Sequence, residues 1–304
     1  MTNREFYSIF SSEAVCRTHF QQMRLKDGVE CKKCSCSDHY WLPSKEQFEC
    51  KECSFRTTLR SGTLLESSKL PFMKWYEAFH LLSMSKKPIS ARTLERHLEV
   101  HYETACYMLQ KIRIAMGSRN RDYHLEGLLE VDETQVTVMD LSNEENDKGN
   151  GKRKGRGAAK AKVLVMTSFS KSNNPKSRSG RTLNYVAMEI LDSFSTASIK
   201  LVMGKWIKRH SRIYTDGFSS YRSIKSEFPQ LTQHVASGVQ AAIKLPIVHT
   251  IIGNLKNAIK GIHHSISLLH LQNYLDEFCY KTNRRNAPDS LMESIAMQSV
   301  RFSW

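Results

Sequence analysis

Two pairs of cysteines near the N-terminus constrain the fold of this chain more than any other feature. The segment CKKCSCSDHYWLPSKEQFECKECSF places Cys31 and Cys34 fifteen residues before Cys50 and Cys53. Two Cys-x2-Cys turns at this spacing bring four thiolates around a tetrahedral Zn²⁺ ion. The HYWL and QFEC stretches between them suit short strands around a Pro-Ser turn. We therefore predict a structural zinc ribbon with no open coordination position; four unrelated reduced cysteines are the alternative.

The composition favours a nucleic acid as the partner of this chain. Its 304 residues are enough for two or three domains, and its formal net charge is +15 at pH 7. There is no apolar run of about 18 residues and no strongly amphipathic basic terminal helix, so no membrane partner is expected. The N-terminal MTNREFYSIF lacks the pattern of a signal peptide. We expect a cytoplasmic protein, associated with the nucleoid if it is bacterial.

A pair of helices is predicted after the ribbon. Ser90 can cap a helix over Arg92–Leu98, and a longer helix begins soon after the turn at Glu99–Tyr102. Glu99, the first residue of the turn, occupies a position where Gly is common, which weakens the match. The small Ala105, in contrast, suits a place where two helices cross. These features favour a helix-turn-helix, with an ordinary helical hairpin as the alternative. In a DNA-binding unit the second helix would face the major groove with Thr104, Tyr107, Gln110 and Lys111.

The region from about residue 125 is rich in β-strand patterns. LLEVDETQVTV, KVLVMTSF and TLNYVAMEIL suit an antiparallel meander, and RIYTDG follows among alternating helices and strands. The first strand carries Asp132 at its centre, where burial of a carboxylate is costly unless something binds it. Asp216 ends RIYTDG beside Gly217, which would let a ligand approach. The alternative for Asp132 is an exposed strand face.

Asp132 and Asp216 are a candidate pair on neighbouring strands. Two such carboxylates repel each other unless cations lie between them. Mg²⁺ prefers one or two carboxylates together with phosphate oxygens, and two such ions support phosphodiester chemistry. A divalent-metal site for phosphodiester chemistry is therefore the functional interpretation of this pair.

A basic, glycine-rich segment over residues 148–162 separates the first two predicted strands. Its lysines and arginines can follow a phosphate backbone without a fixed geometry, although a solvated loop explains them equally. The predicted DNA contacts in this segment are Lys152, Arg153, Lys154 and Arg156.

The order of these features resembles one family. A zinc ribbon, a helix-turn-helix, VDET, GKRKGRGAAKAKVLV, YTDGFSSY, VHTIIGNLKNAIKGIHH and HLQNYLDEFCYKTNRRN follow one another over roughly residues 10–286. This order is similar to that of DDE-type transposases of bacterial insertion sequences, in the subgroup with an N-terminal zinc ribbon. The resemblance implies an α/β RNase H-like catalytic core, with a mixed sheet flanked by helices. It also implies dependence on Mg²⁺, or Mn²⁺ in its place, and cleavage and strand transfer at terminal inverted repeats.

The resemblance also implies roles for single residues. Asp132 in VDET corresponds to the first catalytic acid, and Asp216 in YTDG to the second. The third position, which follows His-Thr on a helix, holds Asn254, as in a D-D-N(K) variant of the family. All three would bind Mg²⁺. The matching lysine is Lys260, with Lys256 as the second choice; either would contact DNA phosphate near the cut.

Asn254 brings no negative charge, so a second metal ion would be held more weakly. Glu130 or Glu133 would compensate if it reached the site. Side chains alternate along a strand, so Glu130 is expected to share the face of Asp132 and Glu133 is not.

The sequence divides into four predicted parts. They are an N-terminal helix and zinc ribbon (1–66), a helix-turn-helix region (67–118), an RNase H-like core (125–288) and a C-terminal tail (289–304). The predicted partners are double-stranded DNA, as terminal repeats and as target, and further copies of the chain, since two ends must be joined. Two rival functions remain: a transposase-derived DNA-binding regulator without catalysis, and an RNA-binding factor.

Overall fold

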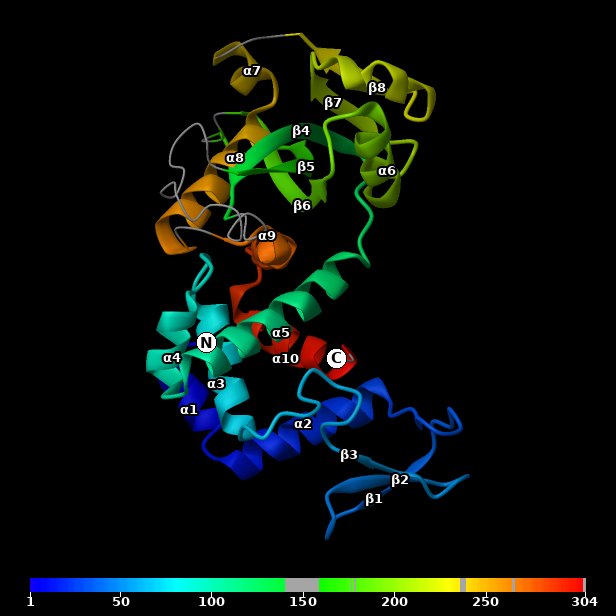
Figure 1. The fold of residues 1–304 in the computed structure, drawn as a ribbon, viewed down its shortest axis with the longest axis vertical. Helices are drawn as coiled ribbons and strands as arrows, with labels where there is room; N and C mark the ends of the chain where they lie inside the picture. Colours follow the sequence, from blue (N-terminus) through cyan, green and yellow to red (C-terminus); the bar gives the residue numbers. More distant parts are fainter. Residues whose placement is uncertain (140–158, 176, 178, 236–238, 264–265, 303–304) are drawn as a thin grey trace, which may run out of the picture. The chain divides into compact units, whose positions relative to one another are not determined.

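The computed structural model describes residues 1–139, 159–175, 177, 179–235, 239–263 and 266–302. These residues form two compact units, which are Met1–Ser118 together with Asn286–Trp304, and Arg119–Arg285 (Figure 1). In the ranges just given, no helix combines the length and the apolar character needed to cross a lipid bilayer.

Among its described residues the first unit contains a small sheet, six α-helices or parts of them, and the short 3-10 helix η5 (Pro288–Ser290). The sheet is antiparallel in the order β1-β2-β3, and its last strand was not predicted. The strands are β1 (His39–Leu42), β2 (Gln47–Cys50) and β3 (Arg56–Thr58). The α-helices are α1 (Asn3–Ile9), α2 (Glu13–Asp27), α3 (Phe72–Met84), α4 (Ala91–Leu98), the larger part of α5 (Tyr102–Asn120) and α10 (Leu291–Arg301).

Helices α4 and α5 form the predicted helical pair. The Ser90 hydroxyl accepts a hydrogen bond from Thr93 N–H at 3.1 Å and so caps α4. Glu99 ends α4 in the left-handed region with φ of 53°, the conformation that Gly adopts most easily. Leu98 and Ala105 are fully buried beside this turn. The turn therefore adopts a left-handed cap without glycine, and the helix-turn-helix stays a prediction.

The predicted C-terminal tail is wrong for residues 291–301, which form helix α10 and pack against α2 and α3. Met292, Ile295 and Ala296 are buried at helical spacing, which is the signal that the sequence interpretation overlooked. Arg301 Nε donates to Asp27 Oδ1 at 2.7 Å. The first unit is thus closed by a segment that follows the second unit in sequence.

The second unit is built on a five-stranded mixed sheet in the order β6-β5-β4-β7-β8. Strands β4, β5 and β6 are antiparallel to one another, whereas β4 pairs with β7 and β7 with β8 in parallel. This is the predicted RNase H-like architecture; only the last strand was missed. The strands are β4 (Leu128–Thr137), β5 (Lys160–Lys171), β6 (Arg181–Leu191), β7 (Arg212–Asp216) and β8 (Leu231–His234).

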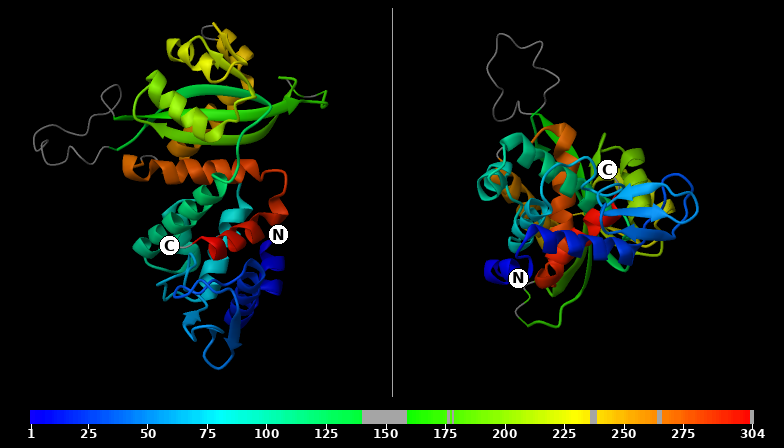
Figure 2. Two further views of the ribbon diagram at one scale, coloured as in Figure 1. Left: turned by 90° about the vertical axis from the view of Figure 1, so that its right-hand side faces the viewer. Right: turned by 90° about the horizontal axis from the view of Figure 1, so that it is seen from below.

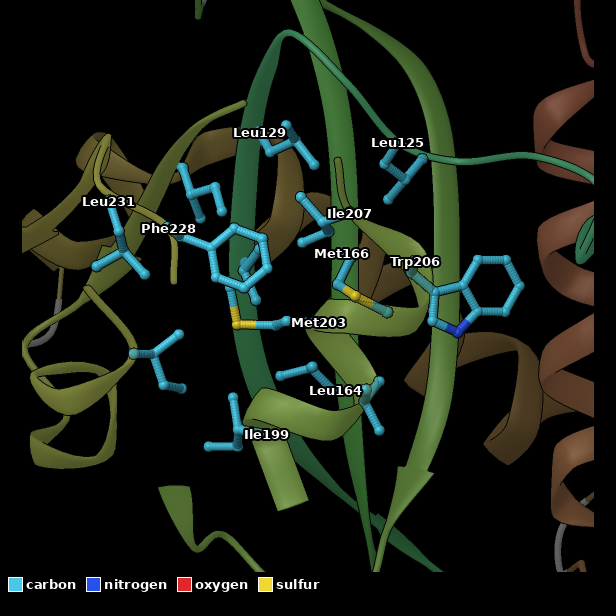
Figure 3. Close-up of a cluster of buried hydrophobic side chains, with 14 of the residues drawn as sticks. Leu125, Leu129, Leu164, Met166, Ile199, Met203, Trp206, Ile207, Phe228 and Leu231 are labelled. Carbon is cyan, nitrogen blue, oxygen red and sulfur yellow. The ribbon is translucent and has the colours of Figure 1, made fainter. Parts of the chain in front are cut away.

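Helices cover both faces of this sheet (Figure 2). On one face, α6 and two short 3-10 turns enclose a core that includes Met166, Met203 and Phe228 (Figure 3). On the other face, α8 and α9 bury Val163 and Leu275 with their neighbours. The helical elements are α6 (Thr196–Trp206), η2 (Ser219–Tyr221), η3 (Ser223–Ser226), α7 (Val239–Lys244), α8 (Pro246–Ala258), the π-helical η4 (Ile259–His263) and α9 (Leu268–Asn283).

Side chains from α9 satisfy the outer backbone groups of the edge strand β6. The Asn283 amide accepts from Val186 N–H at 2.7 Å and donates to Val186 C=O at 3.0 Å. Gln272 accepts from Ile190 N–H at 3.1 Å and donates to Met188 C=O at 3.0 Å. An unprotected edge strand would invite pairing with another chain. The HLQNYLDEFCYKTNRRN segment therefore protects the sheet edge in addition to packing on it.

Candidate active site and metal centres

The predicted zinc ligands lie together in the first unit. One sulfur atom from each of Cys31, Cys34, Cys50 and Cys53 lies within 4.8 Å of the other three. The closest pairs are 3.4 to 3.5 Å apart. A tetrahedron with Zn–S bonds of about 2.3 Å has sulfurs about 3.8 Å apart, so these thiols fit one zinc ion.

Backbone N–H groups in the second Cys-x2-Cys turn favour the metal-binding form of Cys50. The N–H groups of Cys53 and Glu52 point at the sulfur of Cys50 and lower the pKa of its thiol to about 6, against an opposing effect of burial. A thiolate is the form that binds zinc. The four sulfurs complete a tetrahedral shell, which favours a structural role.

The second cluster joins the middle of β4 to the end of β7. Carboxylate oxygens of Asp132, Glu133 and Asp216 all lie within 4.8 Å of one another. Asp132 is buried, and the other two are half-buried. Phe218 N–H donates to Asp216 Oδ1 at 3.0 Å and fixes that carboxylate at the turn after β7. The structure thus brings the two predicted aspartates together and adds a third acid.

Glu133 lies on the opposite face of β4 from Asp132, as the alternation of side chains predicted, and its carboxylate nevertheless reaches the site. The register of β4 with β7 runs only from Leu128–Arg212 to Glu130–Tyr214. Asp132 and Asp216 lie two residues beyond the last pair, where the strands are no longer hydrogen-bonded. Side chains from opposite faces of β4 can therefore meet at the opening. Glu133 enters from the α6 face, held by Tyr221 Oη, which donates to its Oε2 at 2.7 Å.

The electrostatics of the acid cluster favour a bound cation. Burial raises the pKa of Asp132 to about 7, and the negative charge of Asp216 adds to that effect. Burial likewise raises the pKa of Glu133 to about 7, although the hydrogen bond from Tyr221 opposes the rise. Without a cation, protonation of Asp132 and Glu133 is therefore favoured near neutral pH, because burial disfavours their charged forms and the neighbouring carboxylates add negative charge.

The donor set fits magnesium or manganese. All donors are carboxylate oxygens, which these hard cations prefer, and no thiol or amine competes in this cluster. Two ligands on opposite sides of one Mg²⁺ ion lie about 4.2 Å apart. The spread of the oxygens matches one ion or a closely spaced pair.

Helix α8 borders the site with two basic side chains. His249 Nδ1 lies 3.8 Å from Asp132 Oδ2. The positive charge of Lys256 acts to lower the pKa of Asp132, although burial outweighs it. These residues are seven positions apart, which brings them within about 20° of each other around a helix. Lys256, the second choice for the lysine role, is therefore on the side of α8 that faces the acids.

Asn254 lies on another side of the same helix. It is exposed, and five residues of helix rotate it by about 140° from His249. The role of Asn254 as third ligand therefore stays a prediction that follows from the resemblance. Lys260 is also exposed and lies beyond α8, in the π-helical segment η4, where the wider turn changes its direction.

Glu130 anchors α8 and does not join the acid cluster. Its side chain is fully buried. Glu130 Oε2 accepts hydrogen bonds from the N–H groups of Ile247 and Val248, both at 2.8 Å, and Oε1 forms an ion pair with Arg181. A carboxylate at the N-terminus of a helix satisfies N–H groups that lack helical partners and favours the helix dipole. Glu130 therefore holds the first turn of α8 against β4, beside Asp132.

Gly217 lies where another part of the chain approaches closely. A Cβ atom at this position would lie 3.2 Å from Val235 Cα. Close approach of the chain after β8 therefore favours glycine here.

The predicted DNA contacts on α5 divide into two groups. Tyr107 is 42% exposed, and Thr104 and Gln110 are half-buried. The predicted DNA contact of Lys111 is wrong, because its side chain is buried. Its ammonium donates to the carbonyls of Leu64 and Glu66, both at 2.9 Å. It ties the loop before α3 to α5 within the first unit. The contacts predicted at Lys152, Arg153, Lys154 and Arg156 lie outside the described residues.

Comparisons with known proteins point to one family. The profile of the ISXO2-like transposase domain matches residues 124–283, and that of the transposase zinc-ribbon domain matches residues 11–56. A curated relative, described as an uncharacterized protein in transposable element ISH50 of Halobacterium salinarum, is 28% identical over 147 residues. That match covers 47% of this chain and 48% of the relative, so the chain spans about half of the relative's length.

Two of the similar solved structures are Mos1 complexes. The pre-cleavage Mos1 transpososome is 13% identical, with coverage of 72% of this chain and 77% of that chain, and a TM-score of 0.31. The mariner Mos1 paired end complex with Mg is 13% identical, with coverage of 77% and 81% and a TM-score of 0.29. Such low scores transfer no structural detail.

The family assignment rests on the two profile matches. The first includes β4, β7 and α8, which carry or border the acid cluster, and extends over slightly more than half of the 304 residues. The second contains all four zinc-site cysteines. The chain belongs to the ISXO2-like transposase domain family.

Proposed function

We propose that this protein is an active insertion-sequence transposase that cuts phosphodiester bonds at the ends of its element. The freed 3′ hydroxyl then attacks a phosphodiester of the target DNA and releases the target's own 3′ oxygen, so the number of bonds is conserved. The observation that carries the proposal is the cluster of three carboxylates at the parting of β4 and β7 in an RNase H-like sheet. No covalent bond between protein and DNA is required.

The residues in and around the cluster have different proposed roles. Asp132 and Asp216 would hold the divalent ions, Mg²⁺ or Mn²⁺. When bound, such ions supply Lewis acidity that activates the attacking oxygen and stabilises the leaving oxygen. Lys256, on the same side of α8 as His249, would bind a phosphate oxygen of the DNA near the cut. Glu130 keeps α8 at its distance from β4.

DNA recognition is assigned to the first unit and to the basic segment. Thr104, Tyr107 and Gln110 on α5 would approach the major groove, as expected of the second helix of a helix-turn-helix. The net charge of +15 supports binding to a polyanion. Two element ends must be cut and joined together, so we propose at least a dimer on DNA. Action on chromosomal DNA would place the protein in the cytoplasm, at the nucleoid.

A cleavage assay tests this function. Purified protein is incubated with labelled duplex that carries the repeats flanking its own gene, with Mg²⁺, with Mn²⁺ or with EDTA. The expected result is cutting at the repeat end that requires the metal. Cutting should vanish in Asp132→Ala and Asp216→Ala while DNA binding survives.

The control variant Asp122→Ala removes an exposed aspartate that pairs with Arg119 and should cut normally. Tight repeat-specific binding by the wild type, with no cutting under either metal, would contradict the proposal and favour a regulator. Tighter binding to RNA than to duplex ends would favour the RNA-binding rival.

A further inference from the structure

We propose that a pocket beside the turn between β5 and β6 binds one unpaired nucleotide of a DNA strand that is cut at the acid cluster. Lys171 binds a phosphate of this nucleotide, and Tyr214 stacks on its base. This inference rests on the proposed function and deepens it, because it assigns a DNA subsite within the second unit that is separate from the three acids.

The pocket lies on the face of the sheet that α8 and α9 cover, and four neighbouring strands build it. Its volume is about 400 Å³, within the usual range for sites that hold a small ligand. The register places the lining side chains together, because directly paired residues share a face of the sheet. Leu128 is paired with Phe169, and Lys171 is paired with Arg181. Tyr214 of β7 completes the wall.

Positive charge surrounds the pocket. Among the described residues that line it, Lys171 and Arg181 are cations and none is acidic. Arg181 is paired with the buried Glu130, whereas Lys171 is exposed. Arg212, which is exposed and paired with Leu128 in the register, adds a third positive charge on the same face. These charges favour an anionic ligand, with Lys171 as the most accessible contact for a phosphate.

The floor of the pocket is aromatic. The ring centroids of Phe169 and Tyr214 are 6.2 Å apart, and the Arg181 guanidinium lies 4.7 Å and 6.0 Å from them. Phe169 is buried, so the half-buried Tyr214 presents the accessible ring. Tyr214 also stacks on His234 with ring centroids 5.6 Å apart, which holds its plane in one orientation. Nucleic-acid bases stack on aromatic rings and on guanidinium planes, so rings beside cations favour a nucleotide over a bare phosphate.

The form of the pocket favours a single strand over a duplex. In a duplex each base is stacked on both faces, so only an unpaired base can reach the Tyr214 ring. A duplex would offer its phosphates to Lys171 and Arg212 but would leave the aromatic floor unused. The expected occupant is therefore a nucleotide that has left the duplex near the cut.

The pocket is close enough to the acid cluster for one strand to reach both. Tyr214 and Asp216 are two residues apart on one face of β7, about 7 Å along the strand. His234, which stacks on Tyr214, is the register partner of Asp216. A strand with its scissile phosphate at the acids can therefore place a nearby nucleotide on Tyr214.

Photo-crosslinking tests the stacking of a base on Tyr214. Duplexes with the element end and a short unpaired flank carry 5-iododeoxyuridine at one position each and are irradiated with the protein, without added Mg²⁺ or Mn²⁺. Crosslinks should appear at one or two adjacent positions near the cut, on the peptide that contains Tyr214. Tyr214→Phe should keep them and Tyr214→Leu should lose them. The control Tyr185→Leu, which removes a 41% exposed ring stacked on Tyr123, should crosslink like the wild type.

The salt dependence of binding tests Lys171. Fluorescence anisotropy measures the Kd of the same flanked duplex between about 50 and 200 mM salt. Each phosphate contact to a single strand contributes about 0.7 to the slope of log K against log salt, so Lys171→Gln should reduce the slope by about 0.7. The control Lys225→Gln, on η3 at the opposite face of the sheet, should leave it unchanged. Tyr214→Leu should weaken binding by about 5- to 150-fold with little change in slope, because stacking releases no counterions.

The outcomes separate the subsite from the function beneath it. Circular dichroism melts first show that each variant is folded. Wild-type slope in Lys171→Gln and wild-type crosslinking in Tyr214→Leu, with metal-dependent cutting by the wild type, would overturn the subsite and leave the function standing. Crosslinking that requires Tyr214, in a wild type that does not cut with either metal, would support the subsite and contradict the transposase. Tighter, Tyr214-dependent binding to an RNA of the same sequence would overturn the assignment to DNA.

Discussion

Replacing Glu130 with alanine removes a buried carboxylate that three groups share. The N–H groups of Ile247 and Val248 would lose their acceptor at the N-terminus of α8, and Arg181 would lose its ion-pair partner. No exposed side chain replaces these contacts easily, because Glu130 is fully buried within the sheet. The substitution should therefore loosen the first turn of α8 and, with it, the placement of His249.

The size of the effect follows from these contacts. Breaking a buried ion pair by removing one partner costs about 3–5 kcal/mol. The Arg181 side chain is 27% exposed, so water can solvate part of the charge left behind. Hydrogen bonds to charged groups contribute about 1.5–3 kcal/mol each, and some of that loss is recovered when water enters. We expect Glu130→Ala to lower the free energy of unfolding of the second unit by about 2–4 kcal/mol.

Urea unfolding of the variants measures this loss, and amide hydrogen exchange over residues 245–258 shows whether α8 opens first. The matched control is Glu227→Ala, which removes a surface ion pair with Lys200 at 2.8 Å and should leave stability nearly unchanged. A loss below about 1 kcal/mol in Glu130→Ala, or unchanged exchange at Ile247 and Val248, would refute the anchoring argument.

Three further predictions concern other parts of the chain. Cys50→Ser should abolish zinc binding and unfold residues 31–58 while the second unit stays folded, as zinc analysis and hydrogen exchange would show; a folded, metal-free ribbon would count against a structural site. Asn283→Ala should destabilise the second unit by about 1–3 kcal/mol in urea, because Val186 N–H and C=O at the edge of β6 lose their partners; wild-type stability would show that water replaces them. The pKa values of Asp132 and Glu133 rise from 3.8 and 4.5 to about 7 on folding, so their charged forms are disfavoured and metal-free protein should lose stability as pH rises from about 4 to 7. Thermal melts should therefore show greater stabilisation by Mg²⁺ at pH 8 than at pH 6, and Asp132→Asn should reduce this difference; equal stabilisation at both pH values in the wild type would contradict the protonation argument.

The parts that sequence reasoning predicted correctly are those with strong local signals. Cysteine spacing predicted the cluster of four cysteines, and alternation of apolar residues predicted the meander of β4, β5 and β6. The proximity of Asp132 and Asp216 could be predicted because each aspartate has a definite position in a recognisable strand pattern. Strand β8 was missed because LTQH is short and mostly polar, and its strand character comes from pairing with β7.

The errors share one cause, which is that the sequence does not show where neighbouring elements part or cross. Alternation correctly predicted that Glu130 shares the face of Asp132 and that Glu133 does not, but it could not show that β4 and β7 separate beyond Glu130, where the Glu133 side chain reaches the opening. Lys111 looked like an exposed recognition residue because its environment depends on carbonyls 45 or more residues away in sequence. The packing of α10 onto α2 is likewise a contact between distant parts of the chain.

The most direct test of the central claim is an anomalous-scattering map of the protein crystallised with Mn²⁺ and a duplex that carries its element end. The account predicts manganese between Asp132 and Asp216, contacting a DNA phosphate, with Lys256 on the same side. Manganese absent from this cluster, or bound elsewhere while the DNA end lies away from the opening between β4 and β7, would contradict it.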